Sequence, residues 1–277
     1  MPTATQVARA AKQPRGGYIP PKMMAIEDFA DDAYRDELVL NMDAEQSHPA
    51  TIGVVVDYMT RFMLEARADP DSVGLQMECF SIPRLGIRED TLTAEQFYEV
   101  ASRVKGLDRD SIDAMFMLTA WDTMFRSGIE MDPEKLHPDD VSIKHVVMMV
   151  EKALEMLGDG DIAVGPVFIG GFPRNIRAAD ADYIRDGWLV DMKVSRREIP
   201  DNKQTLQLMI YYIMGKKVAE RGSYACIPNP FRDAFESMRG IEILNPRCGI
   251  RWRLPVSEIP DEVIIAIRED VMGGYEE

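Results

Sequence analysis

Two charged side chains interrupt the apolar run Trp188–Val194, and their types and spacing could do chemistry. Side chains of a β-strand alternate between its two faces, so Asp191 and Lys193 should point the same way, beside Leu189. The opposite face carries apolar side chains alone. A carboxylate or an ammonium group is costly to bury without a partner. The pattern therefore indicates a polar site on one face of this strand.

Further acidic side chains precede the strand 188–194, on the other side of an expected hairpin. The dipeptide Asp186–Gly187 lies between two apolar runs, which is a strong signal for a tight turn, so Tyr183–Ile184 should pair antiparallel with the next strand. Asp180 and Asp182 share a face, and one of them can come close to Asp191. Two carboxylates beside a lysine repel each other unless a cation lies between them, which favours oxygen-bound Mg²⁺ or Mn²⁺ and a lysine that holds a water. The alternative is a solvated hairpin in which Asp191 pairs with the lysine on an exposed strand.

Composition limits the class of protein. The chain has 277 residues, of which 46% are hydrophobic and 29% charged, enough for one large domain or one domain with a helical elaboration. No run reaches the roughly eighteen apolar residues of a membrane-spanning helix, and the N-terminus lacks the apolar segment of a signal peptide. We therefore expect a cytoplasmic protein without membrane association. Cys79, Cys226 and Cys248 are too far apart for a metal cluster and odd in number, so buried thiols are expected.

The charge distribution bears on nucleic-acid binding. The net charge of -15 argues against a general nucleic-acid-binding surface, since phosphate contacts need lysine and arginine. Residues 174–221 are the exception, because they hold ten basic and seven acidic side chains. This net-basic stretch surrounds the suspected site, and it includes Arg196 and Arg197 as candidate substrate-binding residues.

The remaining segments suggest how the chain is organised. Residues 1–22 are basic, with paired glycines and prolines, and are expected to form a flexible arm. Residues 23–277 would form one domain, with a mostly helical insertion at about 70–140. The acidic stretch 26–41 is expected to be helical, and residues 162–171 to form a strand leading into the hairpin.

Two helices and a second hairpin complete the expected fold. The apolar spacing of residues 47–64 predicts a helix, on which Asp57 is a functional carboxylate, a solvated edge residue or the partner of Arg61 one turn later. A second helix begins near residue 204 and carries Gln207 and Tyr211 on one face. Two C-terminal strands, at 241–247 and 250–255, should extend the sheet before a closing helix at 260–272. The arginines on these strands either bind phosphates or guard a sheet edge.

Taken in order, these elements resemble the PD-(D/E)xK nuclease superfamily, especially its RecB-type and lambda-exonuclease-like members. The residues that carry the resemblance are Asp57 on the first helix, Asp182 before a strand, Asp191-x-Lys193 on the next strand and Gln207-x-x-x-Tyr211 on the following helix. They fall within 47–64 and 168–214. The expected helical insertion at about 70–140 matches none of the superfamily's motifs.

The resemblance implies a fold and a set of roles. The fold would be α/β, a restriction-endonuclease-like core with a central mixed β-sheet flanked by helices, plus the helical insertion. Asp182 is preferred to Asp180 as a ligand because it directly precedes the strand. The implied assignments are magnesium binding by Asp182, Asp191, the Met192 carbonyl and Asp57, water orientation by Lys193, and bracing of the site or a DNA end by Gln207 and Tyr211.

The function expected from these roles is metal-dependent hydrolysis of DNA phosphodiester bonds, in exonuclease-like or end-processing work such as phage recombination or defence. Single-stranded DNA or duplex ends would be the substrate, and a second copy or a recombination protein a possible partner. One alternative is a catalytically inactive DNA-binding or scaffolding protein on the same fold. Another is an unrelated α/β fold, in which Asp182, Asp191 and Lys193 would diverge in space.

Overall fold

A six-stranded mixed sheet forms the centre of the computed structural model, which describes residues 2–68, 79–221, 223–224 and 227–275. Strands β4 and β7 are parallel, and the other neighbouring strands are antiparallel. In spatial order the strands are β1 (Ala25–Asp28), β8 (Ile250–Pro255), β7 (Gly240–Asn245), β4 (Trp188–Met192), β3 (Tyr183–Arg185) and β2 (Ile162–Val164). The expected hairpin and the expected C-terminal strand pair are both present.

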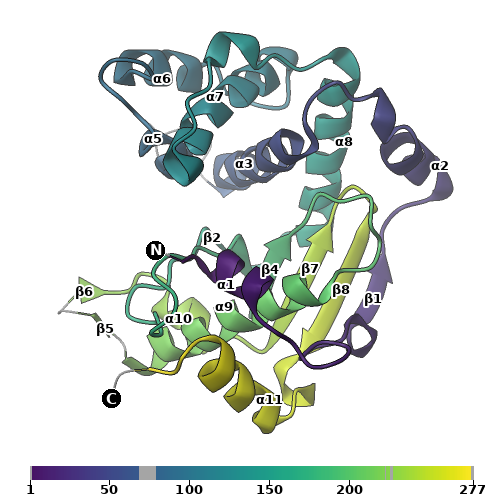
Figure 1. Cartoon of the computed structure of the whole chain (residues 1–277). Helices are drawn as coiled ribbons and strands as arrows, with labels where there is room; N and C mark the ends of the chain where they lie inside the picture. The colour runs from purple at the N-terminus through teal and green to yellow at the C-terminus, as the bar shows by residue number, and fades with distance from the viewer. Residues whose placement is uncertain (1, 69–78, 222, 225–226, 276–277) are drawn as a thin grey trace.

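Helices cover both faces of the sheet (Figure 1). One face packs against α3 (Pro49–Ala68) and α8 (Asp140–Leu157), through a core that includes Val190 and Met192. The opposite face packs against α9 (Asn202–Arg221), through a second core that includes Leu189. The alternation expected along β4 therefore divides its side chains between two apolar cores, and the α/β class with a mixed, helix-flanked sheet is confirmed.

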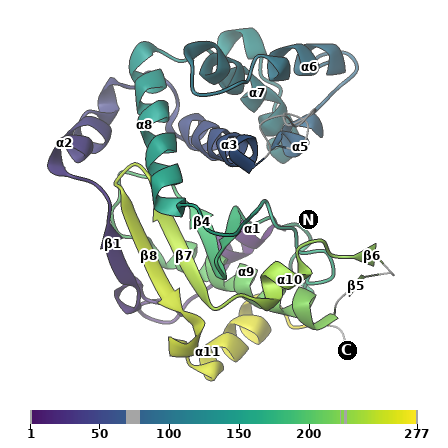
Figure 2. The ribbon, with the colours of Figure 1, turned by 180° about the vertical axis from the view of Figure 1, so that it is seen from behind.

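The expected helical elaboration extends the first core. It contains α5 (Ser81–Arg84), α6 (Ala94–Ser102) and α7 (Arg109–Ser127), followed by the 3₁₀ turn η4 (Pro133–Lys135). Helices α6 and α7 lie beyond α3, away from the sheet, in both views, and α5 lies beside α3 (Figures 1 and 2). Helix α7 contacts α3 and α5, and its buried side chains join the same core as those of α3 and α8. The helical part and the sheet therefore share a hydrophobic core.

The N-terminal segment differs from the expected flexible arm. It contains α1 (Ala4–Ala10), which begins with a reciprocal capping pair between Thr3 and Gln6. Ala4 and Ala8 are buried, and α1 packs against α9. The small side chains let the two helices approach closely, which the basic composition of the segment did not indicate.

Two further expectations are wrong in part. The segment 26–41 begins as strand β1, paired with β8, and becomes helical in α2 (Asp32–Arg35) and the π-helical turn η2 (Asp36–Leu40). The strand expected at 162–171 ends at Val164, because Gly165 has φ +60° and the chain leaves the sheet there.

The closing helix is present as α11 (Asp261–Ala266) with the π-helical turn η6 (Ile267–Val271). Cys79 and Cys248 are buried, and Cys226 lies outside the described residues.

Candidate functional site

The hairpin between β3 and β4 brings Asp182 to Asp191. Tyr183 pairs with Val190, so Asp182 and Asp191 are the next residues along the two strands. The Met192 backbone N–H donates a hydrogen bond of 2.7 Å to Asp182 Oδ2. The Asp191 side chain is 3% exposed and lies on the face that packs toward α9. Two carboxylates thus occupy facing positions on neighbouring strands, with Asp191 buried and the Asp182 side chain 22% exposed.

Lys193 follows β4 and supplies a positive charge to this pair. Its Nζ lies 2.6 Å from Asp191 Oδ2, and its backbone N–H donates to the Leu244 carbonyl at 2.8 Å. The ion pair between Asp191 and Lys193 appears in both sequence hypotheses. However, the exposed strand that the solvated-hairpin hypothesis requires is not observed, because β4 is buried along most of its length.

Arg61 on α3 joins the helix to the strand acids, and it was not among the predicted site residues. Its Nη2 lies 2.9 Å from Asp57 Oδ2 and 3.2 Å from Asp182 Oδ1. The Tyr183 hydroxyl donates to Asp57 Oδ1 at 3.0 Å. The i, i+4 spacing of Asp57 and Arg61 was the available signal, and it correctly indicated their pairing. The contact from Arg61 to Asp182 required the tertiary structure.

Burial and mutual repulsion change the protonation of these acids. The pKa of Asp182 is raised to about 8, first by burial and then by the charges of Asp57 and Asp191, against the opposing effect of Arg61 and Lys193. Burial also raises the pKa of Asp191, although Lys193 opposes it. Two facing carboxylates are therefore held without enough positive charge to keep both ionised at neutral pH.

The pKa values of the two cations, Lys193 and Arg61, are also raised, so their charged forms are favoured. Burial alone would lower the pKa of Lys193, but the charges of Asp191 and Asp182 outweigh it and raise the value. The pKa of Arg61 is likewise raised well above its usual range, because Asp57, Tyr183 and Asp182 outweigh its burial. Lys193 is therefore an ammonium group at neutral pH, suited to holding a water or a phosphate oxygen and not to acting as a base.

Gln207 and Tyr211 lie together on α9, beneath the acids. The Gln207 Nε2 donates a hydrogen bond of 2.9 Å to the Tyr211 hydroxyl, and the Tyr211 ring stacks on Phe168 with centroids 5.3 Å apart. The pKa of Tyr211 is raised by burial and then by the charges of the strand acids, Asp191 first. The expected Gln-x-x-x-Tyr pair is thus on the helix that faces the site, with its two polar groups bonded to each other.

Three other predicted residues lie at the margin. Asp180 Oδ2 is 3.9 Å from Arg126 Nη2 and lines a cavity of about 260 Å³ that also touches Arg61. Arg196 and Arg197 are exposed on the loop after β4. Within the described ranges no ion pair joins either arginine to the acids. The structure therefore brings Asp57, Asp182, Asp191 and Lys193 together and leaves Asp180, Arg196 and Arg197 around them.

The arginines of the C-terminal strands do not form a phosphate-binding surface. Arg247 is bonded to Glu45 at 2.7 Å and to the Leu38 carbonyl. Arg251 donates to the Met156 carbonyl at 2.6 Å, and Arg253 Nε lies 2.6 Å from Glu242 Oε2. These guanidinium groups stabilise the interior and the sheet edge.

Among the described residues, no group of three or more histidine, cysteine, aspartate or glutamate side chains is arranged to hold a metal ion. Two carboxylates do converge, but the third acid, Asp57, is engaged by Arg61 and Tyr183. No helix in the described ranges is long and apolar enough to cross a membrane. The chain matches no known family model, no curated protein and no solved structure.

Proposed function

We propose that this protein is a metal-dependent nuclease that hydrolyses DNA phosphodiester bonds at Asp182, Asp191 and Lys193. The observation that carries the proposal is the meeting of two carboxylates on adjacent strands, the buried Asp191 and the partly exposed Asp182, with the Lys193 ammonium group 2.6 Å from Asp191. Perturbed acids gathered with a lysine are characteristic of functional sites. A third hypothesis, an unrelated fold in which these residues diverge, is not supported.

The protonation of the pair is consistent with a divalent cation. A raised pKa on both acids means that a further positive charge would stabilise their ionised form. Asp182 and Asp191 would be the carboxylate ligands. Because the N–H and C=O of a strand residue point to the same side, the Met192 carbonyl is directed toward the same edge as its N–H, which contacts Asp182. With Asp57 held by Arg61, the proposal relies on two carboxylates and one carbonyl.

Each side chain then has a role in hydrolysis. Bound Mg²⁺ or Mn²⁺ would supply a water that is nucleophilic near neutral pH and would neutralise charge at the leaving oxygen. Lys193 would hold that water, or a phosphate oxygen, by hydrogen bonds. Arg61 would keep Asp57 and Asp182 in place, and Gln207 with Tyr211 would support Asp191 from α9. The exposed Arg196 and Arg197 would contact the strand's phosphates.

The order of elements supports a restriction-endonuclease-like core. Along the chain, the acid-bearing helix α3 precedes the hairpin β3–β4, which precedes the Gln-x-x-x-Tyr helix α9. This is the order of the PD-(D/E)xK superfamily that the sequence resembles. The parallel pairing of β4 with β7 across the connection through α9 completes a mixed core sheet.

A second candidate is a catalytically inactive DNA-binding or scaffolding protein on the same fold. Arg61 favours it, because a guanidinium group between Asp57 and Asp182 already neutralises charge that a metal would otherwise balance. In that case the acids, the lysine and the arginine would form a closed structural network.

The decisive experiment compares cleavage of labelled linear, circular and single-stranded DNA with Mg²⁺, with Mn²⁺ and with a chelator. The test variant is Lys193→Ala, and the matched control is Lys203→Ala, which removes the same charge from an exposed position on α9. Metal-dependent cutting by the wild type and the control, lost in a folded Lys193→Ala protein, would support the nuclease. No cutting, together with no Mn²⁺ binding by calorimetry, would refute it and favour the binding protein.

A further inference from the structure

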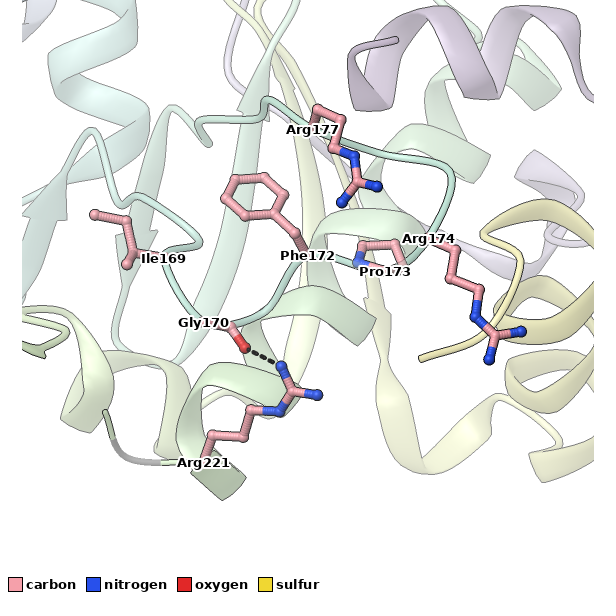
Figure 3. Close-up of a pocket in the computed structure, with 7 residues that line it drawn as sticks. All are labelled: Ile169, Gly170, Phe172, Pro173, Arg174, Arg177 and Arg221. Carbon is pink, nitrogen blue, oxygen red and sulfur yellow. Dashed lines mark hydrogen bonds between the residues drawn. The ribbon is translucent and has the colours of Figure 1, made fainter. Parts of the chain in front are cut away.

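A cavity lined by three arginines lies apart from the carboxylate site. It has a volume of about 330 Å³ and lies between the loop that joins β2 to β3 and the C-terminal end of α9 (Figure 3). No acidic residue belongs to its described lining, which comprises Ile169, Gly170, Phe172, Pro173, Arg174, Arg177 and Arg221. The positive charge of this lining contrasts with the net charge of -15 of the chain.

The backbone around this cavity is held by three distant segments. The Arg174 and Arg177 N–H groups donate to the carbonyls of Gly274 and Pro2, at 3.1 and 3.0 Å. A Cβ atom on Gly171 would lie 2.4 Å from the Met214 carbonyl oxygen, so glycine lets the loop lie directly on α9. The loop is therefore a fixed wall, which lowers the entropic cost of binding a ligand there.

The side chains of the wall are suited to a nucleotide unit. Arg221 Nη1 donates to the Gly170 carbonyl at 3.1 Å, which fixes its guanidinium at the cavity. The Phe172 ring lies between the Ile169 and Arg177 side chains in the view of Figure 3. Within the described part of the chain, no acidic side chain forms an ion pair with Arg174 or Arg177. Arginine binds phosphate in a bidentate manner, and an aromatic ring stacks on a base. The same two arginines also line a neighbouring cavity of about 570 Å³, whose lining includes Lys12 and one acid, Asp270.

From this arrangement we propose that the arginine pocket binds a phosphate group of the nucleic-acid strand at a distance from the cleavage site. This inference rests on the proposed nuclease function. Two segments contribute to both sites, because the β2–β3 loop ends at Asp182 and α9 also carries Gln207. Gln207 and Arg221 are fourteen residues apart on α9, which corresponds to about 21 Å along the helix axis. That length spans about six phosphates of a B-form strand.

The test variant is the double substitution Arg174→Ala with Arg177→Ala. The matched control is Arg109→Ala with Lys135→Ala, which removes two charges from exposed positions, 65% and 80% exposed, in the helical part. Binding of fluorescein-labelled single-stranded and duplex DNA is measured by anisotropy in chelator, so that no cleavage occurs. The test variant should bind about tenfold more weakly, with a salt dependence reduced by about two phosphate contacts. The control should stay within about twofold of the wild type.

The outcomes separate this inference from the nuclease proposal. If the wild type cuts DNA and the test variant binds and cuts like the control, the pocket proposal fails and the nuclease stands. If the wild type does not cut but binds DNA through these arginines, the nuclease fails and the pocket stands. In a competition experiment, inorganic phosphate and deoxyadenosine monophosphate are added to the labelled DNA. This distinguishes a nucleic-acid strand from a free nucleotide as the ligand of the pocket. Binding of these small anions without DNA binding would overturn the assignment to a strand.

Discussion

Asp182→Asn should change how the stability of the protein depends on pH. Burial and the charges of Asp57 and Asp191 raise the pKa of Asp182 to about 8, whereas an unfolded aspartate has a pKa of about 3.9. Between these values the folded protein keeps a proton that the unfolded chain has lost. The free energy of unfolding should therefore fall as the pH rises through this window, and asparagine, which does not titrate, should remove that contribution.

The size of the effect follows from linkage. One proton held by the folded state alone corresponds to about 1.4 kcal/mol per pH unit. From about pH 5 to about pH 8 the wild type should therefore lose up to roughly 4 kcal/mol through Asp182, with the slope levelling off near the upper end. This is a large part of the roughly 5 to 15 kcal/mol that stabilises a typical domain. Asparagine retains an oxygen that can accept the Met192 N–H bond, so the variant should fold.

Urea denaturation at four pH values in chelator measures this difference. The control is Asp180→Asn, which alters a partly exposed acid at the margin of the site. The difference in unfolding free energy between wild type and Asp182→Asn should change steadily with pH, while the control should run parallel to the wild type. Parallel curves for all three proteins would refute the reasoning. With Mg²⁺ present, the wild type should gain stability at the upper pH values, and Asp182→Asn should gain less.

Three further substitutions test the surrounding structure by urea denaturation. Arg61→Leu removes a buried guanidinium group and leaves the partly buried carboxylates of Asp57 and Asp182 without their cation, which should cost up to about 3 kcal/mol, against little change for Arg67→Leu at an exposed position of α3. An equal loss of unfolding free energy in Arg61→Leu and Arg67→Leu would show that the ion pairs of Arg61 do not stabilise the fold. Tyr211→Phe removes the acceptor of the Gln207 amide and should cost about 1 to 2 kcal/mol; an unchanged midpoint would mean that the amide finds another partner. Gly187→Ala should cost at least about 1 kcal/mol, since glycine has φ +76° there and a Cβ atom would meet a carbonyl oxygen at 2.6 Å; a neutral result would contradict the observed turn.

Local patterns were sufficient for the elements that carry the candidate site. Asp186 and Gly187 have φ +47° and +76°, which is the turn that an Asp-Gly pair favours between two short strands. The alternation along β4 correctly placed Leu189 and Val190 on opposite faces of the strand, although the face with Leu189 also packs into a core. These features depend on residues close in sequence, so the period of the side chains and the turn chemistry decided them.

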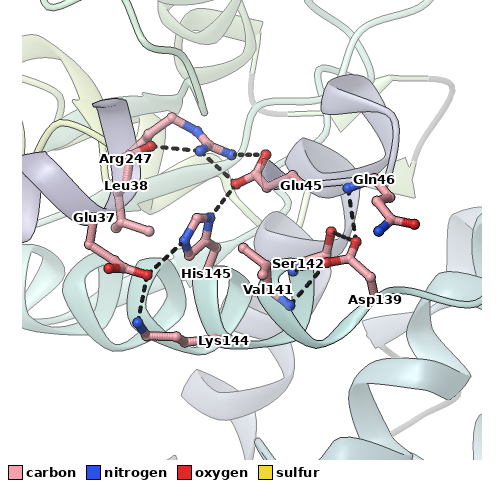
Figure 4. Close-up of polar contacts among 10 residues, drawn as sticks. All are labelled: Glu37, Leu38, Glu45, Gln46, Asp139, Val141, Ser142, Lys144, His145 and Arg247. Atoms are coloured by element: carbon pink, nitrogen blue, oxygen red, sulfur yellow. Dashed lines mark hydrogen bonds and ion pairs between the residues drawn. The ribbon is translucent and has the colours of Figure 1, made fainter. Parts of the chain in front are cut away.

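Other features depended on partners distant in sequence. The segment 26–41 looked helical because its apolar spacing and acidity suit a helix, yet its start is strand β1 because β8 offers an unpaired edge. The Arg247 side chain looked available for phosphate, but it lies in a buried network with Glu45 and His145, from segments far apart along the chain (Figure 4). No local pattern records such a neighbour.

For the candidate site, the sequence alone determined which acids and which lysine share a hairpin, because strand period and turn type follow from adjacent residues. The Asp57–Arg61 pair was likewise visible as one turn of a helix. Only the tertiary structure decided that Arg61 reaches Asp182 and that the arginines of the β2–β3 loop meet the end of α9. Such encounters are set by how helices pack on a sheet, where burial of apolar surface chooses the arrangement and the polar groups take the partners that it supplies.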